Sequence, residues 1–99
     1  MSTSADDRSV FVWRDFSRFV HVAPVERGWL VLWGHFRHGG RARDLAGQRT
    51  YADLFGARRR VADSVFELTR SSELVVEAMV RFDRTPFPVH RPIPLLDPL

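Results

Sequence analysis

Arginine is the residue type with the clearest chemical potential in this sequence, because all fifteen basic residues are arginines. Residues 37–60 hold seven of them against two aspartates, a local net charge of +5, whereas the rest of the chain sums to −2. A guanidinium group matches a phosphate with parallel N–H donors, and the free N–H groups at a helix start also attract anions. The segment therefore predicts a polyanion-binding set that consists of Arg41, Arg43, Arg49, Arg58, Arg59 and Arg60.

A solvated loop in an arginine-biased proteome is the simpler interpretation of the same segment. Gly40 and Gly47 are wrongly spaced for a phosphate-binding loop, and no lysine follows them. Arg58 adds a second alternative, because it falls within the apolar arc of an expected helix, where a charge must find a partner or reach solvent along its stem. It would either aim an anion-binding group at the sheet or form a salt bridge with Glu73, Glu77 or an aspartate.

The histidines form a possible ligand set for a metal or a small molecule. His35 and His38 are three residues apart, but they fall at an expected strand end and turn, which would direct them to opposite faces. His21 could reach His35 if their strands pair, and imidazole is a common zinc ligand. A hydrogen-bonded histidine on the sheet face is the simpler alternative, and the sequence indicates no cofactor.

Aromatic residues on a predicted strand form another candidate surface. This interface or stacking face comprises Trp29, Val31, Trp33 and His35, with Met79 and Arg81 from a neighbouring strand. Aromatic rings beside arginine can stack single-stranded bases. Tryptophan and arginine are also common in dimer interfaces, and tryptophan in cores, so we favour a core or dimer interface here.

No group of residues in the sequence indicates catalysis. The chain has no cysteine, which excludes disulfides, thiol nucleophiles and cysteine-ligated metal clusters. Ser64, Ser71 and Ser72 lack the setting of a nucleophile elbow. A small chain with one helix has little room for a deep pocket, so we expect a binding protein rather than an enzyme.

The elements that must position these residues include one well-defined hairpin. Residues 19–25 read as a strand, Glu26-Arg27-Gly28 as a turn, and residues 29–37 as a central strand with two apolar faces. Residues 10–13 fit either a strand or the start of a short helix. The glycine-containing segment 38–49 is expected to be a loop.

The second half of the chain supplies the predicted helix layer. Residues 50–69 are apolar on one arc, and Thr50 with Asp53 resembles a capping box, which predicts one amphipathic helix. Residues 73–83 alternate and predict a last strand, with a helix as the alternative. The expected fold is a small α+β domain of order (β)ββαβ, with a mostly antiparallel sheet of three to four strands and one helix on one face.

The length indicates a single domain. We expect a disordered N-terminus at 1–8, the α+β domain at 9–85, and a proline-rich extended tail at 86–99 packed on the domain or on a partner. No signal peptide or membrane-length apolar run is visible, which predicts a cytoplasmic protein without a membrane partner.

The uncovered second face of the sheet leads to the functional hypotheses. One helix can cover one face only, so a tail, a ligand or a second copy must cover the other. The leading hypothesis is a non-catalytic interaction module that forms a homodimer. The alternatives are a nucleic-acid-binding accessory protein that uses residues 37–60, and a small-ligand or metal-binding protein around His21 and His35.

Overall fold

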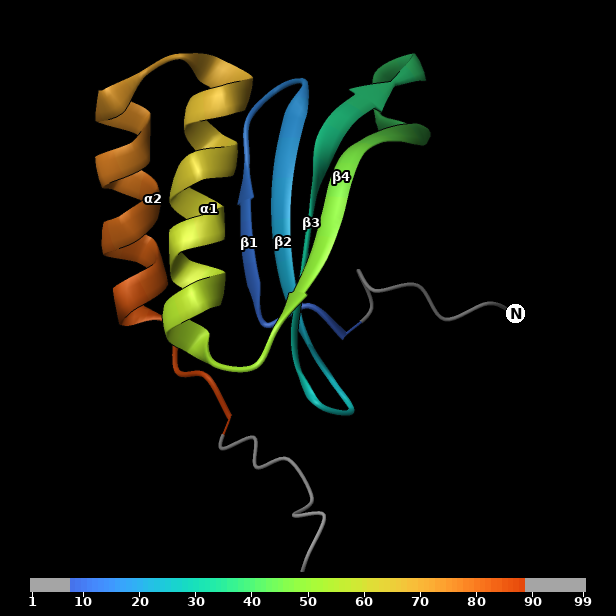
Figure 1. The fold of residues 1–99 in the computed structure, drawn as a ribbon. Coiled ribbons are helices and arrows are strands. Elements are labelled where there is room, and N and C mark those ends of the chain that lie inside the picture. Colours follow the sequence, from blue (N-terminus) through green and yellow to red (C-terminus); the bar gives the residue numbers. More distant parts are fainter. Residues whose placement is uncertain (1–7, 89–99) are drawn as a thin grey trace, which may run out of the picture.

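The computed structural model describes residues 8–88 and shows a small α+β fold with a four-stranded antiparallel sheet and two helices (Figure 1). The strands pair in chain order, β1-β2-β3-β4. The elements are β1 (Phe11–Arg14), β2 (Arg18–Val25), β3 (Gly28–Arg37), β4 (Ala42–Tyr51), α1 (Leu54–Thr69) and α2 (Ser72–Arg84). Both helices pack on the same side of the sheet, so the predicted fold class is confirmed and the predicted single helix is wrong.

The core lies between the sheet and this helix layer. Alternating strand residues point into it, because successive side chains of a strand project to opposite faces. The buried apolar cluster comprises Phe11, Trp13, Val20, Val22, Trp29, Val31 and Trp33 from the strands, with Ala57, Val61, Val65, Ala78 and Phe82 from the helices. Burying each large apolar side chain contributes about 1.5–3 kcal/mol of favourable transfer free energy.

The segment from 42 to 51 is a strand, which corrects the expected loop at 38–49 and moves the helix start. The glycines that suggested a loop have two structural roles. Gly39 and Gly40 adopt positive φ angles of 66° and 93° in the short 3₁₀ turn at His38–Gly40 that joins β3 to β4. At Gly47 a Cβ would lie 2.4 Å from Cζ2 of Trp33, so only glycine lets β4 pass over that ring.

The helix α1 begins at Leu54 rather than at Thr50. Its N-cap is Asp53, whose Oδ1 accepts a hydrogen bond from the Gly56 N–H at 2.8 Å. Thr50 belongs to β4, where it pairs with Leu30. The predicted capping pair therefore lies near the true helix start, but the N-cap is Asp53 and not Thr50.

Residues 72–84 form a helix, which corrects the predicted strand at 73–83. Arg70 ends α1 in the left-handed conformation, and the Ser71 hydroxyl accepts a hydrogen bond from the Leu74 N–H at 3.1 Å to start α2. Ala78 and Phe82, four residues apart, are buried against the sheet, whereas Val76 and Val80 remain exposed. The apolar residues of this segment fit both the two-residue spacing of a strand and the four-residue spacing of a helix. The helix forms because its apolar side packs beside α1.

The predicted hairpin is confirmed, and the segment around residues 10–13, which fitted either a strand or a helix, is a strand. The two strands β2 and β3 pair from Arg18–His35 to Val25–Gly28 around the expected turn, and residues 11–14 are a strand beside β2. Of the tail, Phe87 lies within the described residues and its ring packs on Phe82 and on Trp29. The rest of the predicted tail, from 89 onward, and residues 1–7 lie outside the described residues.

Two further properties of the described chain bear on function. Neither α1 nor α2 combines the length and apolar character needed to cross a membrane. The sheet face turned away from them has no helix over it within residues 8–88. We call this surface the helix-free face; its residues include Val12, Arg14, Phe19, His21, Ala23, Leu30, Leu32, Phe36 and Arg43.

Candidate functional site

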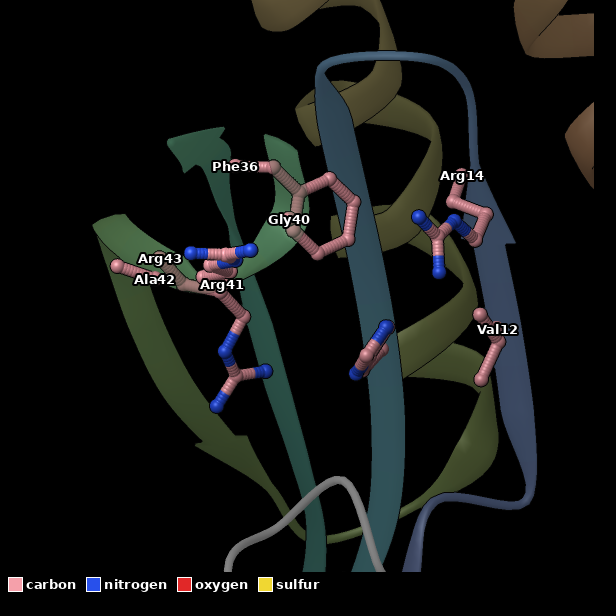
Figure 2. A pocket seen from close by; sticks show the side chains of 8 residues that line it. Val12, Arg14, Phe36, Gly40, Arg41, Ala42 and Arg43 are labelled. Atoms are coloured by element: carbon pink, nitrogen blue, oxygen red, sulfur yellow. The ribbon is translucent and has the colours of Figure 1, made fainter. Parts of the chain in front are cut away.

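A concavity of about 530 Å³ lies on the helix-free face, between β1 and the hairpin that joins β3 to β4 (Figure 2). Its lining residues are Val12, Arg14, His21, Phe36, Gly40, Arg41, Ala42 and Arg43. All four strands and the turn between β3 and β4 thus contribute to one surface. The volume falls within the range typical of small-ligand sites, about 300–1,000 Å³.

The strand register explains why these residues gather. Arg14 pairs with Phe19 across β1 and β2, and Phe36 pairs with Arg43 across β3 and β4. Directly paired residues project to the same side of a sheet. Phe19 is fully buried below this surface, and its ring contacts those of Phe36 and His21 at centroid distances of 5.1 and 5.0 Å. A fixed aromatic base therefore supports the more exposed Phe36 ring.

Cationic groups surround this aromatic base. The Arg14 guanidinium lies 4.4 Å from the Phe36 ring centroid, and that of Arg43 lies 5.2 Å from Phe19. Such cation–π contacts hold a guanidinium against a ring, and at Arg14 the edge of the group keeps N–H donors for an anion. Arg41 extends from the turn on the far side of the concavity, as Figure 2 shows.

No carboxylate is among the described residues that line the concavity. Asp44 is the one acidic residue within the four strands, and it pairs with His35 on the helix-covered side, where it binds Arg37 at 2.8 Å. Within residues 8–88, neither Arg14 nor Arg41 forms an ion pair. The positive potential of the concavity is therefore available to an external anion.

A second concavity of about 260 Å³ adjoins the first and shares Arg14, Phe36 and Gly40 with it. Its distinguishing residue is Phe16, which is 97% exposed at the tip of the β1–β2 turn. A phenylalanine that contacts almost nothing contributes little to folding, and an exposed ring beside arginines offers a stacking surface. Together the two concavities form a continuous site, which we call the arginine–phenylalanine groove.

The turn that carries Phe16 is rigidly built. Oδ1 of Asp15 accepts hydrogen bonds from the Ser17 and Arg18 N–H groups, and the Arg18 guanidinium donates to Oδ2 at 2.7 and 3.0 Å. Arg18 also donates to the Leu68 carbonyl at the end of α1, at 2.9 Å. Partial burial works to raise the pKa of Asp15, but the hydrogen bonds from Arg18 and Ser17 outweigh it and hold the pKa below its ordinary value.

The structure divides the predicted polyanion-binding set between the two sides of the sheet. Arg41 and Arg43 line the groove, whereas Arg49 pairs with Val31 on the helix-covered side. The three consecutive arginines lie on α1, where Arg59 is exposed, Arg58 binds Asp83 at 2.7 and 2.8 Å, and Arg60 binds Glu67 and stacks on Trp33. The six residues therefore cannot act as one site.

The salt-bridge alternative for Arg58, which allowed an aspartate as the partner, is confirmed. Its partner is Asp83, not Glu73 or Glu77. The hydrogen bond from Arg58 lowers the pKa of Asp83, and the same bond raises the pKa of Arg58. This pair connects α1 to α2 on the outer side of the helix layer.

The predicted aromatic face is not an open surface. Trp29, Val31 and Trp33 are buried beneath the helices. Met79 and Arg81 belong to α2 instead of a neighbouring strand, and Arg81 donates to the Val12 carbonyl at 3.1 Å. The core alternative fits these tryptophans, because the second helix packs on this face.

The predicted approach of His21 to His35 is wrong. His21 pairs with Leu32 and projects to the helix-free face, whereas His35 pairs with Asp44 and projects to the opposite one. Within the described residues, no cluster of three or more histidine, aspartate or glutamate side chains has a metal-binding arrangement.

Sequence reasoning missed Arg14, Phe16 and Phe36. A usable signal was present for Arg14, since a strand at 11–14 paired with 18–25 places it beside Phe19. In comparisons with known proteins, no family model, no curated protein and no solved structure matched the chain significantly.

Proposed function

We propose that this protein is a non-catalytic binding module that holds single-stranded nucleic acid in the arginine–phenylalanine groove. The observation that carries the proposal is the meeting of three arginines and a half-buried phenylalanine at a concavity that no described carboxylate lines. Phosphates would bind the guanidinium groups, and bases would stack on the rings.

The composition of the groove favours binding over catalysis. Among the described residues, the lining of the main concavity has one imidazole, from His21, and no hydroxyl or carboxylate that could act beside it. General acid–base and nucleophilic mechanisms need at least two such groups within hydrogen-bonding reach. Arginine and phenylalanine perform no such chemistry, but they are the residues that bind phosphate and base.

The shape of the surface favours a single strand over a duplex. Phe16 presents an exposed ring, and Phe36 presents its ring with the Arg14 guanidinium over it; aromatic rings and guanidinium planes recognise a base only when that base is unstacked and accessible. Arg14 and Arg41 lie on opposite sides of Phe36 in the groove (Figure 2). This arrangement suits a backbone that follows the groove while one or two bases turn inward.

Fluorescence anisotropy with labelled 12-nucleotide oligo(dT) and oligo(U) tests the proposal. We expect binding at 50 mM salt that weakens as salt rises, since each neutralised phosphate of a single strand contributes a slope of about −0.7 in log K against log salt. The double variant Arg14→Ala/Arg41→Ala should bind at least ~10-fold more weakly, with a shallower salt dependence.

Arg27→Ala is the matched control, because Arg27 is exposed at the turn between β2 and β3 and does not line the groove. It removes the same charge and should leave affinity within about twofold. If Arg27→Ala and a single groove variant lose the same affinity for the oligonucleotide, the interaction is general charge attraction and does not involve the groove. Absence of binding to either oligonucleotide at 50 mM salt would reject the proposed function.

A further inference from the structure

The outer surface of the helix layer carries apolar side chains that the core does not use. Phe55 and Phe66 of α1 are 80% and 43% exposed, and Val76 and Val80 of α2 are 62% and 42% exposed. The sheet-facing side is already filled by Ala57, Val61, Val65, Ala78 and Phe82. Exposed apolar residues gathered on one face usually mark an interaction surface.

The Arg58–Asp83 pair shows that these side chains are neighbours. The helices are antiparallel in Figure 1, and this ion pair sets residue 58 level with residue 83. Val80 lies about one turn before Asp83 and Ala62 about one turn after Arg58, so they share a level. One turn further, Val76 is level with Val65 and Phe66. Ala62, Phe66, Val76 and Val80 therefore form one apolar patch.

Charges at the two ends of this patch have opposite signs. Arg59 and Arg84 are exposed towards the end where α1 begins and α2 ends. Asp63, Glu73 and Glu77 are exposed towards the end where α1 ends and α2 begins. The layer therefore has a basic half, which also holds the paired Asp83, and an acidic half, which also holds Arg70; Asp63 and Glu77 lie close to the level of the apolar patch.

We propose that two copies of this chain associate through these helix-layer faces about a two-fold axis. A two-fold axis that lies in the plane of the interface, perpendicular to the helices, turns the two faces towards each other and reverses the helix direction, so each basic end comes to lie over the acidic end of the other copy. With the axis near the level of Ala62 and Val80, Phe55 of one copy meets the level of Phe66 of the other. Charge pattern and apolar pattern are both self-complementary, which specifies a second copy as the occupant.

The dimer would place the two helix layers between the two sheets. Each helix-free face would then point outward, with its arginine–phenylalanine groove open. If the proposed function also holds, the dimer presents two grooves to one strand, and the second binding event becomes intramolecular. Association itself does not depend on that function.

Multi-angle light scattering after gel filtration, from 5 to 200 µM without nucleic acid, tests the dimer. We expect a mass that approaches twice the chain mass of 11.5 kDa. Val76→Glu/Val80→Glu should give a monomer over the whole range, with an unchanged circular dichroism spectrum because both side chains are exposed. Phe16→Ala is the control on the opposite face and should leave the mass unchanged.

Charge reversal provides a test that loss of folding cannot mimic. Arg59→Glu/Arg84→Glu makes the surface acidic throughout, and Asp63→Arg/Glu77→Arg makes it basic throughout. Each variant alone should be at least tenfold weaker in self-association, whereas a mixture of the two should form a heterodimer. A wild-type monomer at 200 µM, or a mixture that stays monomeric, would overturn the dimer.

These outcomes are separable from a failure of the proposed function. The mass is measured without nucleic acid, and the monomeric Val76→Glu/Val80→Glu variant keeps its groove and can be assayed for oligonucleotide binding alone.

Discussion

The two faces of the sheet are built from the same four strands, and they differ in chemistry where the helices cover one of them. On the helix-covered face, every β1 and β2 residue of the buried cluster is apolar, whereas the helix-free face mixes Phe19 and Leu32 with Arg14, Arg43 and His21. Trp13 and Arg14 are adjacent in the chain and lie on opposite sides. The period of two along a strand thus lets one segment supply both the core and a ligand surface.

The comparison also separates stability from recognition. Side chains on the covered face are enclosed by two helices, and their removal leaves a cavity. Side chains of the groove contact solvent on one side, and their removal should affect binding more than folding. Substitutions on the two faces test whether one face serves folding and the other serves binding.

Trp13→Ala should cause the largest effect. Trp13 is buried on the covered face, and truncating a buried aromatic residue costs about 3–5 kcal/mol. This is a large part of the total stability of a typical domain, about 5–15 kcal/mol. Urea denaturation followed by circular dichroism measures it. Phe16→Ala, three residues beyond Trp13, should change the free energy of unfolding by under ~0.5 kcal/mol. Equal effects would remove the distinction between the faces.

Phe36→Leu should have an intermediate effect, and on binding rather than on stability. Leucine keeps an apolar contact with Phe19 but has no ring on which a base can stack. Stacking contributes about 1–3 kcal/mol per base, which corresponds to a roughly 5- to 150-fold loss of affinity. The anisotropy assay measures the loss, and Phe36→Tyr, which retains a ring, should restore most of it. A leucine variant that binds normally would exclude Phe36 as a stacking residue.

Asp15→Asn should have the smallest effect, and one that depends on pH. Hydrogen bonds lower the pKa of Asp15 in the folded state, so its charged form stabilises the protein above the unfolded pKa, and this contribution is lost as pH falls through the folded value. We expect the variant to be less stable by about 1 kcal/mol at pH 7, since it keeps the turn and loses the charged pair with Arg18. The difference should shrink as pH falls through the lowered folded pKa of Asp15, which urea denaturation at several pH values will show. A difference that is constant with pH would contradict the role of the carboxylate charge.

Parts of the fold could be predicted because they depend on local pattern. The hairpin of β2 and β3 follows from two apolar runs around Glu26-Arg27-Gly28, and α1 follows from its apolar arc. The strand β4 could not be predicted this way. Its residues are exposed or half-buried, and its conformation comes from backbone hydrogen bonds to β3, not from an apolar pattern of its own.

The candidate site was only partly predictable for the same reason. The charge excess pointed to Arg41 and Arg43, which line the groove. It pointed equally to Arg58 and Arg60, which form ion pairs on the helix layer. Charge density along a chain does not say on which side of a sheet each residue lies, and that side depends on strand pairing.

The sequence alone determined the α+β class, the central hairpin, the amphipathic helix α1 and the concentration of arginine in residues 37–60, because each follows from residue type and short-range spacing. Tertiary structure decided that 72–84 is a helix, that it lies beside α1 instead of across the sheet, and hence that the tryptophans are buried while Arg14 and Phe36 face outward. The physical reason is that the apolar stripe of α2 is buried jointly by α1 and by Phe11 of the sheet. No single segment of the chain, taken alone, specifies that α2 packs beside α1 on the sheet.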